Sequence, residues 1–237
     1  MKKYNLIFLL FFIFYLNAER MELSIRYIGL PVVNVEMTDV NNTITVKAKA
    51  TKIASIAAKM DNTYISHYSD NYLPNSYKKI IHQKDYHENR VTEYFRATKT
   101  AKKTSYINYD KNKVFPINSE SRDFFSSLFY LRTVCDQPFG ELYLDANSLI
   151  WKANYKNLGK ELINTELGKL NAIKIKLTFQ KISDKETENT DMLTNNLVTE
   201  EKSLIFWFSD DERHIPLKAK FMMKPFAVVW KLENYSE

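Results

Sequence analysis

The sequence predicts a mainly β (α+β) protein whose curved antiparallel sheet forms a half-barrel or barrel, with one or two short helices. Three observations predict this fold. The chain of 237 residues has 15 tyrosines, 15 phenylalanines and 3 tryptophans but only 4 glycines, which favours strands over a glycine-rich cofactor fold. Short segments with apolar residues at alternate positions recur along the chain, as in residues 43–50. About a dozen strands are too many for a flat open sheet, so the sheet is expected to curl.

The first half of the chain predicts seven strands and one short helix. Gly29 and Leu30 form a hairpin turn between the first two strands, and Asn41 and Asn42 form the next turn. Residues 53–59 are rich in alanine, which favours a short helix. The strands are expected at residues 21–28, 31–38, 43–50, 63–68, 76–82, 90–97 and 104–109.

Residues 123–132 (DFFSSLFYLR) interrupt the strands and predict one short amphipathic helix that lies on the sheet. Its aromatic and leucine residues recur at helical spacing. Ser121 or Asp123 is expected to cap its start, and Arg132 suits its last turn. We interpret the aromatic stripe as core packing, with a ligand wall as the alternative.

Strands resume after Pro138 and continue to the end of the chain. Residues 183–201 are acidic, polar and poor in core-forming residues, which predicts a mobile loop. The remaining strands are expected at residues 141–147, 149–155, 160–164, 170–181, 204–208, 215–223 and 227–232.

The first eighteen residues predict export. Lys2 and Lys3 precede an unbroken apolar run (LIFLLFFIFYL), and Ala18 is a small residue just before polar sequence begins. This run is shorter than the about 20 apolar residues that span a membrane. We therefore expect a signal peptide at residues 1–18, cleaved near Ala18, and a single β-rich domain at residues 19–237 in the periplasm. An uncleaved anchor is the alternative, because Leu16 fits poorly three residues before the cut.

Charge and cysteine content narrow the class further. Cys135 is the only cysteine, so an intramolecular disulfide is excluded, and its distance from the signal predicts that the protein is not a lipoprotein. The net charge of +6 is spread along the chain without the dense basic cluster of nucleic-acid binders. A weak attraction to anionic lipid headgroups stays open. None of the four glycines lies in a nucleotide-binding loop, so no cofactor is expected.

The sequence SDDERHIP, which ends at Pro216, follows an aromatic strand and predicts a hairpin turn. Pro216 would begin the returning strand, where a missing N–H costs little. A metal site or an acid–base pair at Asp210, Asp211, Glu212 and His214 is a weaker hypothesis. The adjacent acids alternate faces and lack the glycine that bends an oxygen-rich cation loop. The four histidines are scattered, with no H-E-x-x-H pattern, so no metal is expected.

Two of these segments carry a resemblance. WFSDDERHIPLK at residues 207–218 and DFFSSLFYLR at residues 123–132 resemble a family of exported bacterial proteins known as domain-of-unknown-function family 3108. Weaker matches are YIGLPV at residues 27–32 and YLPNSY at residues 72–77. The resemblance implies an exported antiparallel β protein with a curved sheet. Its shape would be similar to that of the periplasmic lipoprotein carriers, whose half-barrel holds acyl chains. It implies no catalytic activity.

Three functions stay open at this stage. The first is a non-catalytic periplasmic protein that binds a lipid or another hydrophobic ligand in the curved sheet, with the helix as a lid or plug. The second is an envelope structural or adaptor protein that uses the hairpin at residues 209–216 as a partner surface. The third is a glycan hydrolase, which needs two facing carboxylates. No catalytic or metal-binding residue is assigned, and the candidate binding residues are Trp207, Ser209, Asp210, Asp211, Glu212, Arg213, Pro216, Asp123 and Arg132.

Overall fold

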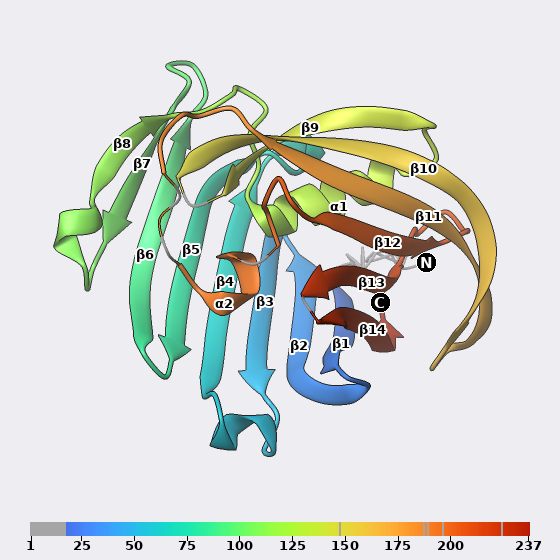
Figure 1. Ribbon diagram of the computed structural model, residues 1–237. Helices are drawn as coiled ribbons and strands as arrows, with labels where there is room; N and C mark the ends of the chain where they lie inside the picture. Colours follow the sequence, from blue (N-terminus) through green and yellow to red (C-terminus); the bar gives the residue numbers. More distant parts are fainter. Residues whose placement is uncertain (1–17, 147, 187, 189, 196, 224) are drawn as a thin grey trace, which may run out of the picture.

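The protein folds around one antiparallel sheet that curves about a helix (Figure 1). Fourteen strands make up this sheet within the described part of the chain. The prediction of a mainly β protein with a curved antiparallel sheet is therefore confirmed. The predicted signal segment lies outside the described residues, apart from Ala18. The computed structural model describes residues 18–146, 148–186, 188, 190–195, 197–223 and 225–237.

The first eight strands run in chain order from the middle of the sheet to one edge. Three single 3₁₀ turns, η1 (Ala54–Ile56), η2 (Asp70–Tyr72) and η3 (Tyr109–Lys111), lie in their connections. The strands are β1 (Glu19–Tyr27), β2 (Leu30–Val40), β3 (Thr43–Ala50), β4 (Met60–Tyr68), β5 (Pro74–Gln83), β6 (Tyr86–Phe95), β7 (Thr100–Ser105) and β8 (Lys113–Pro116).

The second half starts at the other edge and returns to the middle, where β14 pairs with β1. The first and last strands of the chain are therefore neighbours at the centre of the sheet. Two α-helices, α1 (Phe124–Val134) and α2 (Met192–Asn195), precede β9 and β12. The strands are β9 (Phe139–Ala146), β10 (Leu149–Thr165), β11 (Gly168–Lys181), β12 (Ser203–Ser209), β13 (Pro216–Met223) and β14 (Phe226–Ser236).

The two edges of the sheet are linked by the segment that follows β8. Arg122 forms a parallel bridge with Leu144 of β9. The Arg122 N–H donates to the Tyr143 carbonyl at 2.9 Å, and the Asp145 N–H donates to the Arg122 carbonyl at 2.8 Å. The sheet is thus a curved half-barrel whose open side is narrowed by these two hydrogen bonds.

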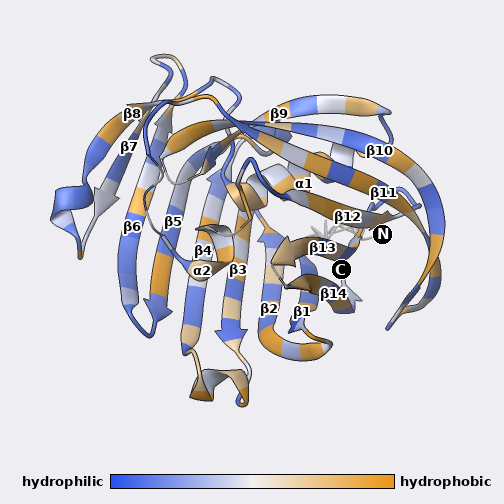
Figure 2. Cartoon of the chain, viewed as in Figure 1, coloured by the Kyte–Doolittle hydropathy of each residue, from blue (hydrophilic) through white to orange (hydrophobic). Residues whose placement is uncertain are grey.

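Helix α1 fills the concave side of the sheet. Asp123 caps it, accepting hydrogen bonds from the N–H groups of Phe125 and Ser126. Of the two caps that the sequence predicts, the helix therefore uses Asp123. Phe125 and Phe129 are buried, and their rings pack on Tyr64 and Tyr72 from the first half of the sheet. These contacts agree with the interpretation of the aromatic stripe as core packing. Figure 2 shows the alternation of apolar and polar residues along the surrounding strands.

Some element boundaries differ from the predictions. The strands expected at residues 149–155 and 160–164 form one long strand, β10, because the break between them is a β-bulge at Gly159, whose φ is 95°. The strand expected at residues 104–109 ends at Ser105, and β8 was not predicted. The expected helix at residues 53–59 is only the turn η1.

The connection from β11 to β12 comprises residues 182–202, and we call its described residues, 182–186, 188, 190–195 and 197–202, the strap. The sequence predicts a mobile loop here, but the described part of the strap is anchored by buried side chains. Leu193, Leu197 and Val198 are buried, and Asp191 is completely buried. The anchoring has an electrostatic cause that composition does not reveal, namely an ion pair between Asp191 and the sheet.

Candidate functional site

The two sequence motifs meet at one end of the sheet. Arg132, in the last turn of α1, donates to the backbone carbonyls of Arg213 and His214 in the β12–β13 hairpin, at 2.8 and 3.0 Å. Its guanidinium also makes two hydrogen bonds of 2.7 Å to the carboxylate of Glu19 at the start of β1. Arg132 thus joins the helix, the hairpin and the first strand. Asp123 lies at the other end of α1, so the structure does not bring it to the hairpin.

The hairpin at residues 209–216 is held by its own side chains. Asp211 accepts hydrogen bonds from the Ser209 hydroxyl at 2.7 Å and from the Arg213 guanidinium. The Ser209 hydroxyl in turn accepts from the N–H of Ile215 at 2.7 Å. The hairpin is therefore a structured turn, as the sequence predicts, and its acids do not converge on one point.

The remaining candidate residues surround this turn. Asp210 pairs with Lys160 at 2.7 Å, and the buried Trp207 donates to Glu161 at 2.5 Å. Pro216 begins β13, which matches the prediction from its missing N–H. Arg213 and Glu212 are exposed at the tip. Two open surface grooves of about 400 and 510 Å³ flank the hairpin, which leaves its tip accessible to a partner.

The hairpin also brings together a cluster that sequence analysis did not group. Ligand atoms of Cys135, Asp136 and His214 lie within 4.8 Å of one another. Burial raises the pKa of the Cys135 thiol to about 12, and the thiol donates to the Arg132 carbonyl. A protonated thiol is a poor metal ligand, since thiolate is the binding form. The cluster offers three potential ligand side chains, and a metal ion would have to displace the thiol proton to use all three.

The interior beneath the strap contains charged groups that sequence analysis missed. Lys79 of β5 pairs with Asp191 at 2.9 Å, and both side chains are at most 4% exposed. Asp191 also accepts a hydrogen bond from the Tyr64 hydroxyl at 2.6 Å. Burial alone would raise the pKa of Asp191, but Lys79 and the hydrogen bonds from Thr194 and Tyr64 hold it well below its usual range. This ion pair ties the strap to the sheet.

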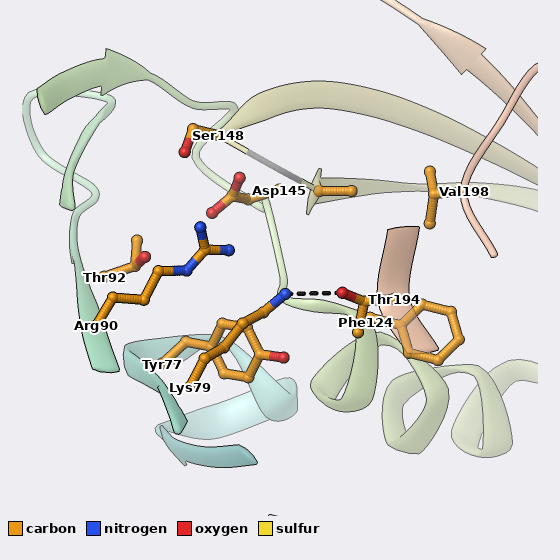
Figure 3. A pocket seen from close by; sticks show the side chains of 10 residues that line it. Tyr77, Lys79, Arg90, Thr92, Phe124, Asp145, Ser148, Thr194 and Val198 are labelled. Atoms are coloured by element: carbon orange, nitrogen blue, oxygen red, sulfur yellow. Dashed lines mark hydrogen bonds between the residues drawn. The ribbon is translucent and has the colours of Figure 1, made fainter. Parts of the chain in front are cut away.

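Beside this pair lies a small polar cavity of about 10 Å³, which has room for about one water molecule. Figure 3 shows Arg90 and Asp145 pointing toward each other across it. Three buried atoms that belong to its lining have no hydrogen-bond partner, namely Arg90 Nε, the Tyr77 hydroxyl oxygen and Asp145 Oδ1. Buried polar atoms in proteins are nearly always paired, so these three require a bound water or ligand.

Asp145, which lines this cavity, makes the stability of the folded protein depend on pH. Burial raises its pKa to about 6, against the opposing effects of Arg90 and of the hydrogen bond from Tyr94. The folded state therefore holds this proton more tightly than the unfolded state, and the stability of the wild type falls as pH rises from about 4 to about 6.

Asp145→Asn is expected to remove this fall and to raise the free energy of unfolding at pH 7 by about 1–3 kcal/mol. Urea unfolding of both proteins from pH 4 to pH 8 measures the effect. The two curves should approach each other as pH falls toward about 4, where the folded-state carboxyl is protonated and the unfolded-state carboxyl is about half protonated. Parallel curves across the whole range would contradict the assignment.

A signal for these residues does exist in the sequence. Lys79 stands between Tyr77 and Ile81 in the inward phase of β5, and Arg90 has the same phase as Tyr94 in β6. Alternation of period two therefore points both cations into the interior. Composition hides this signal, because lysine and arginine are usually exposed.

The fold and this interior define a class of protein, a curved-sheet, β-barrel-like protein with a partly polar core. The chain belongs to the family described as "Protein of unknown function (DUF3108)", whose model matches residues 20–225. This confirms the resemblance drawn from the two motifs. No curated protein matches the chain. Among the described residues, no helix is both long and apolar enough to cross a membrane.

Two solved structures are similar to this chain. One is a β-barrel-like protein of domain-of-unknown-function family 1849 from Brucella abortus, with 8% identity and a TM-score of 0.57 over 92% of this chain and 96% of that one. At this identity the likeness shows the fold alone. The other, from Bacteroides fragilis, is described as exported with a YmcC-like fold. It has 10% identity and a TM-score of 0.29 over 92% of this chain and 95% of that one.

Proposed function

We propose that this protein is a non-catalytic, exported envelope protein that binds an amphipathic ligand inside its curved sheet, with the polar group of the ligand beside Arg90. One observation carries the proposal. Arg90 is 5% exposed, and its Nε atom has no hydrogen-bond partner. A buried guanidinium N–H without an acceptor costs about 1–3 kcal/mol or more. A ligand that supplies the acceptor recovers this energy.

The unpaired atoms indicate the chemistry of that polar group. Arg90 Nε is a donor and needs an acceptor such as a phosphate, carboxylate or carbonyl oxygen. Asp145 Oδ1 needs a donor such as a hydroxyl or ammonium group, and the Tyr77 hydroxyl can act in either sense. A headgroup that carries both an anionic oxygen and a hydroxyl or ammonium satisfies all three atoms.

The apolar part of the ligand has a place next to this site. A second void of about 10 Å³ is lined by Leu128, Leu144, Phe179 and Phe206, and Phe124 borders both voids. Neither void has room for an acyl chain as the protein is folded here. Ligand entry therefore requires the strap to move away from the sheet, which breaks the Lys79–Asp191 pair.

The experiment is mass spectrometry of organic extracts from the protein purified from its native envelope. The proposal predicts a stoichiometric amphipathic molecule on the wild type and its loss from Arg90→Gln. Lys78→Gln is the matched control, because Lys78 neighbours the site on β5 but has the outward phase. A wild-type protein that carries no organic molecule, or equal loading of all three proteins, would contradict the proposal.

The adaptor function is the second candidate, and the small size of the interior voids favours it. It uses the hairpin tip, where Arg213 is 51% exposed and paired with Asp211. Arg213→Glu should then reduce in-cell crosslinking from the hairpin to a specific envelope protein, while Lys220→Glu on β13 should not. Unchanged crosslinking would contradict this function.

A further inference from the structure

We propose that the end of the sheet carrying the β3–β4 connection docks on an anionic lipid surface. This inference concerns the outer surface of the protein and does not depend on the interior ligand. Because neighbouring strands are antiparallel, the β1–β2, β3–β4 and β5–β6 connections all lie at one end of the sheet. The strap connects β11 to β12 at this same end, and the Met192 N–H donates to Gln83 of β5.

Large apolar side chains project from this end into solvent. Ile53 and Ile56 in the β3–β4 connection are 82% and 89% exposed, and Ile28 and Leu30 at the β1–β2 tip are 60% and 67% exposed. Figure 2 shows the apolar colour at both tips. Ile28 also has a φ of 52°, a conformation that β-branched residues rarely adopt. The backbone conformation of Ile28 costs folding energy, and none of these four side chains is buried in return. Exposed apolar clusters of this kind are typical of surfaces that become buried on binding.

Positive charge surrounds the isoleucines. An open groove of about 660 Å³ beside them is lined by the four lysines Lys49, Lys52, Lys59 and Lys84, and Asp61 is the one acidic residue in that lining. Lysines around an apolar tip are the arrangement of peripheral membrane proteins, because the ammonium groups reach anionic headgroups while the apolar residues enter the interface. The occupant that fits both features is a bilayer with anionic lipids.

The opposite end of the sheet lacks this excess of lysines. In the hairpin there, Asp210 and Asp211 are paired with Lys160 and Arg213, and Glu212 is exposed. The adjacent groove is lined by the acids Glu19, Asp39 and Glu237 and by the cations Arg132 and Arg213. An anionic surface therefore attracts the lysine-lined end more strongly than the hairpin end, which favours one orientation of the protein on the bilayer.

Vesicle flotation tests the proposal with the chain from Glu19 onward, which contains every strand and helix of the sheet. We expect the protein to float with vesicles of equal parts phosphatidylglycerol and phosphatidylethanolamine, but not with phosphatidylcholine vesicles. High salt should weaken binding. Ile53→Ser/Ile56→Ser and Lys52→Gln/Lys59→Gln should each reduce binding about tenfold or more.

The matched control is Leu162→Ser/Leu167→Ser. These leucines are exposed near the β10–β11 turn, which lies at the opposite end of the sheet. This variant should bind like the wild type. Thermal unfolding of each variant separates lost docking from lost folding. The proposal is overturned if the wild type does not bind anionic vesicles, if it binds phosphatidylcholine equally, or if the control variant loses as much binding as the isoleucine variant.

Discussion

Asp191→Ala is expected to lower the free energy of unfolding by about 3–5 kcal/mol, because it leaves the Lys79 ammonium buried without a counterion. The substitution also removes the acceptor of the Tyr64 hydroxyl and of the Thr194 N–H in the short helix α2. Urea unfolding at pH 7 measures this loss. The gap between variant and wild type should narrow as pH falls below about 4, since the pKa of Asp191 is lower in the folded state than in the unfolded state.

Two controls distinguish an unpaired charge from a general loss of packing. Lys79→Met/Asp191→Leu removes both charges and should recover a large part of the lost stability. Lys160→Ala breaks the exposed pair with Asp210 and should cost less than about 1 kcal/mol. If Lys79→Met/Asp191→Leu is less stable than Asp191→Ala alone, the charge argument is wrong.

Arg132→Ala is the second large expected effect, at about 3 kcal/mol. The sequence alone supports about 1–3 kcal/mol for a buried group at this position. The structure places the effect at the upper end of that range, because the guanidinium satisfies two backbone carbonyls and the Glu19 carboxylate at once. Thermal and urea unfolding measure it.

Arg213→Ala is the matched control for this substitution. Among the described residues Arg213 forms its ion pair within its own turn, and its guanidinium lies 5.5 Å from the centre of the Tyr235 ring. Because Arg213 is half exposed, its removal should cost less than about 1 kcal/mol. If both arginine substitutions lower the free energy of unfolding equally, the contacts between the helix and the hairpin do not stabilise the fold. Glu19→Gln should show an intermediate loss, since it keeps the backbone contacts of Arg132.

The sequence predicted the architecture because alternation of period two and turn residues are local signals. Thr43–Ala50 and the Asn41-Asn42 turn need no knowledge of the rest of the chain. Boundaries failed where a long-range partner decides them. Gly159 looks like a strand end, but pairing with β11 carries β10 through it as a bulge.

The candidate site was predicted only where its contacts are local in the sequence. The hairpin is local, and its Ser209 and Asp211 contacts follow from turn chemistry. Its link to Arg132 spans about 80 residues, and the Lys79–Asp191 pair spans 112. No spacing rule connects such residues. The strap is an example. Its polar composition predicts a mobile loop, but one buried ion pair anchors it to the sheet.

The pairing of β1 with β14 has a consequence for how the chain reaches its fold. The centre of the sheet cannot form until the last eleven residues of the sheet, Phe226–Ser236, have been synthesised. A nascent chain therefore keeps one edge of β1 unpaired throughout translation, and contacts between the chain ends make folding slow. For the export proposed above this delay is an advantage, because the completed sheet would form only after the whole chain had crossed the membrane.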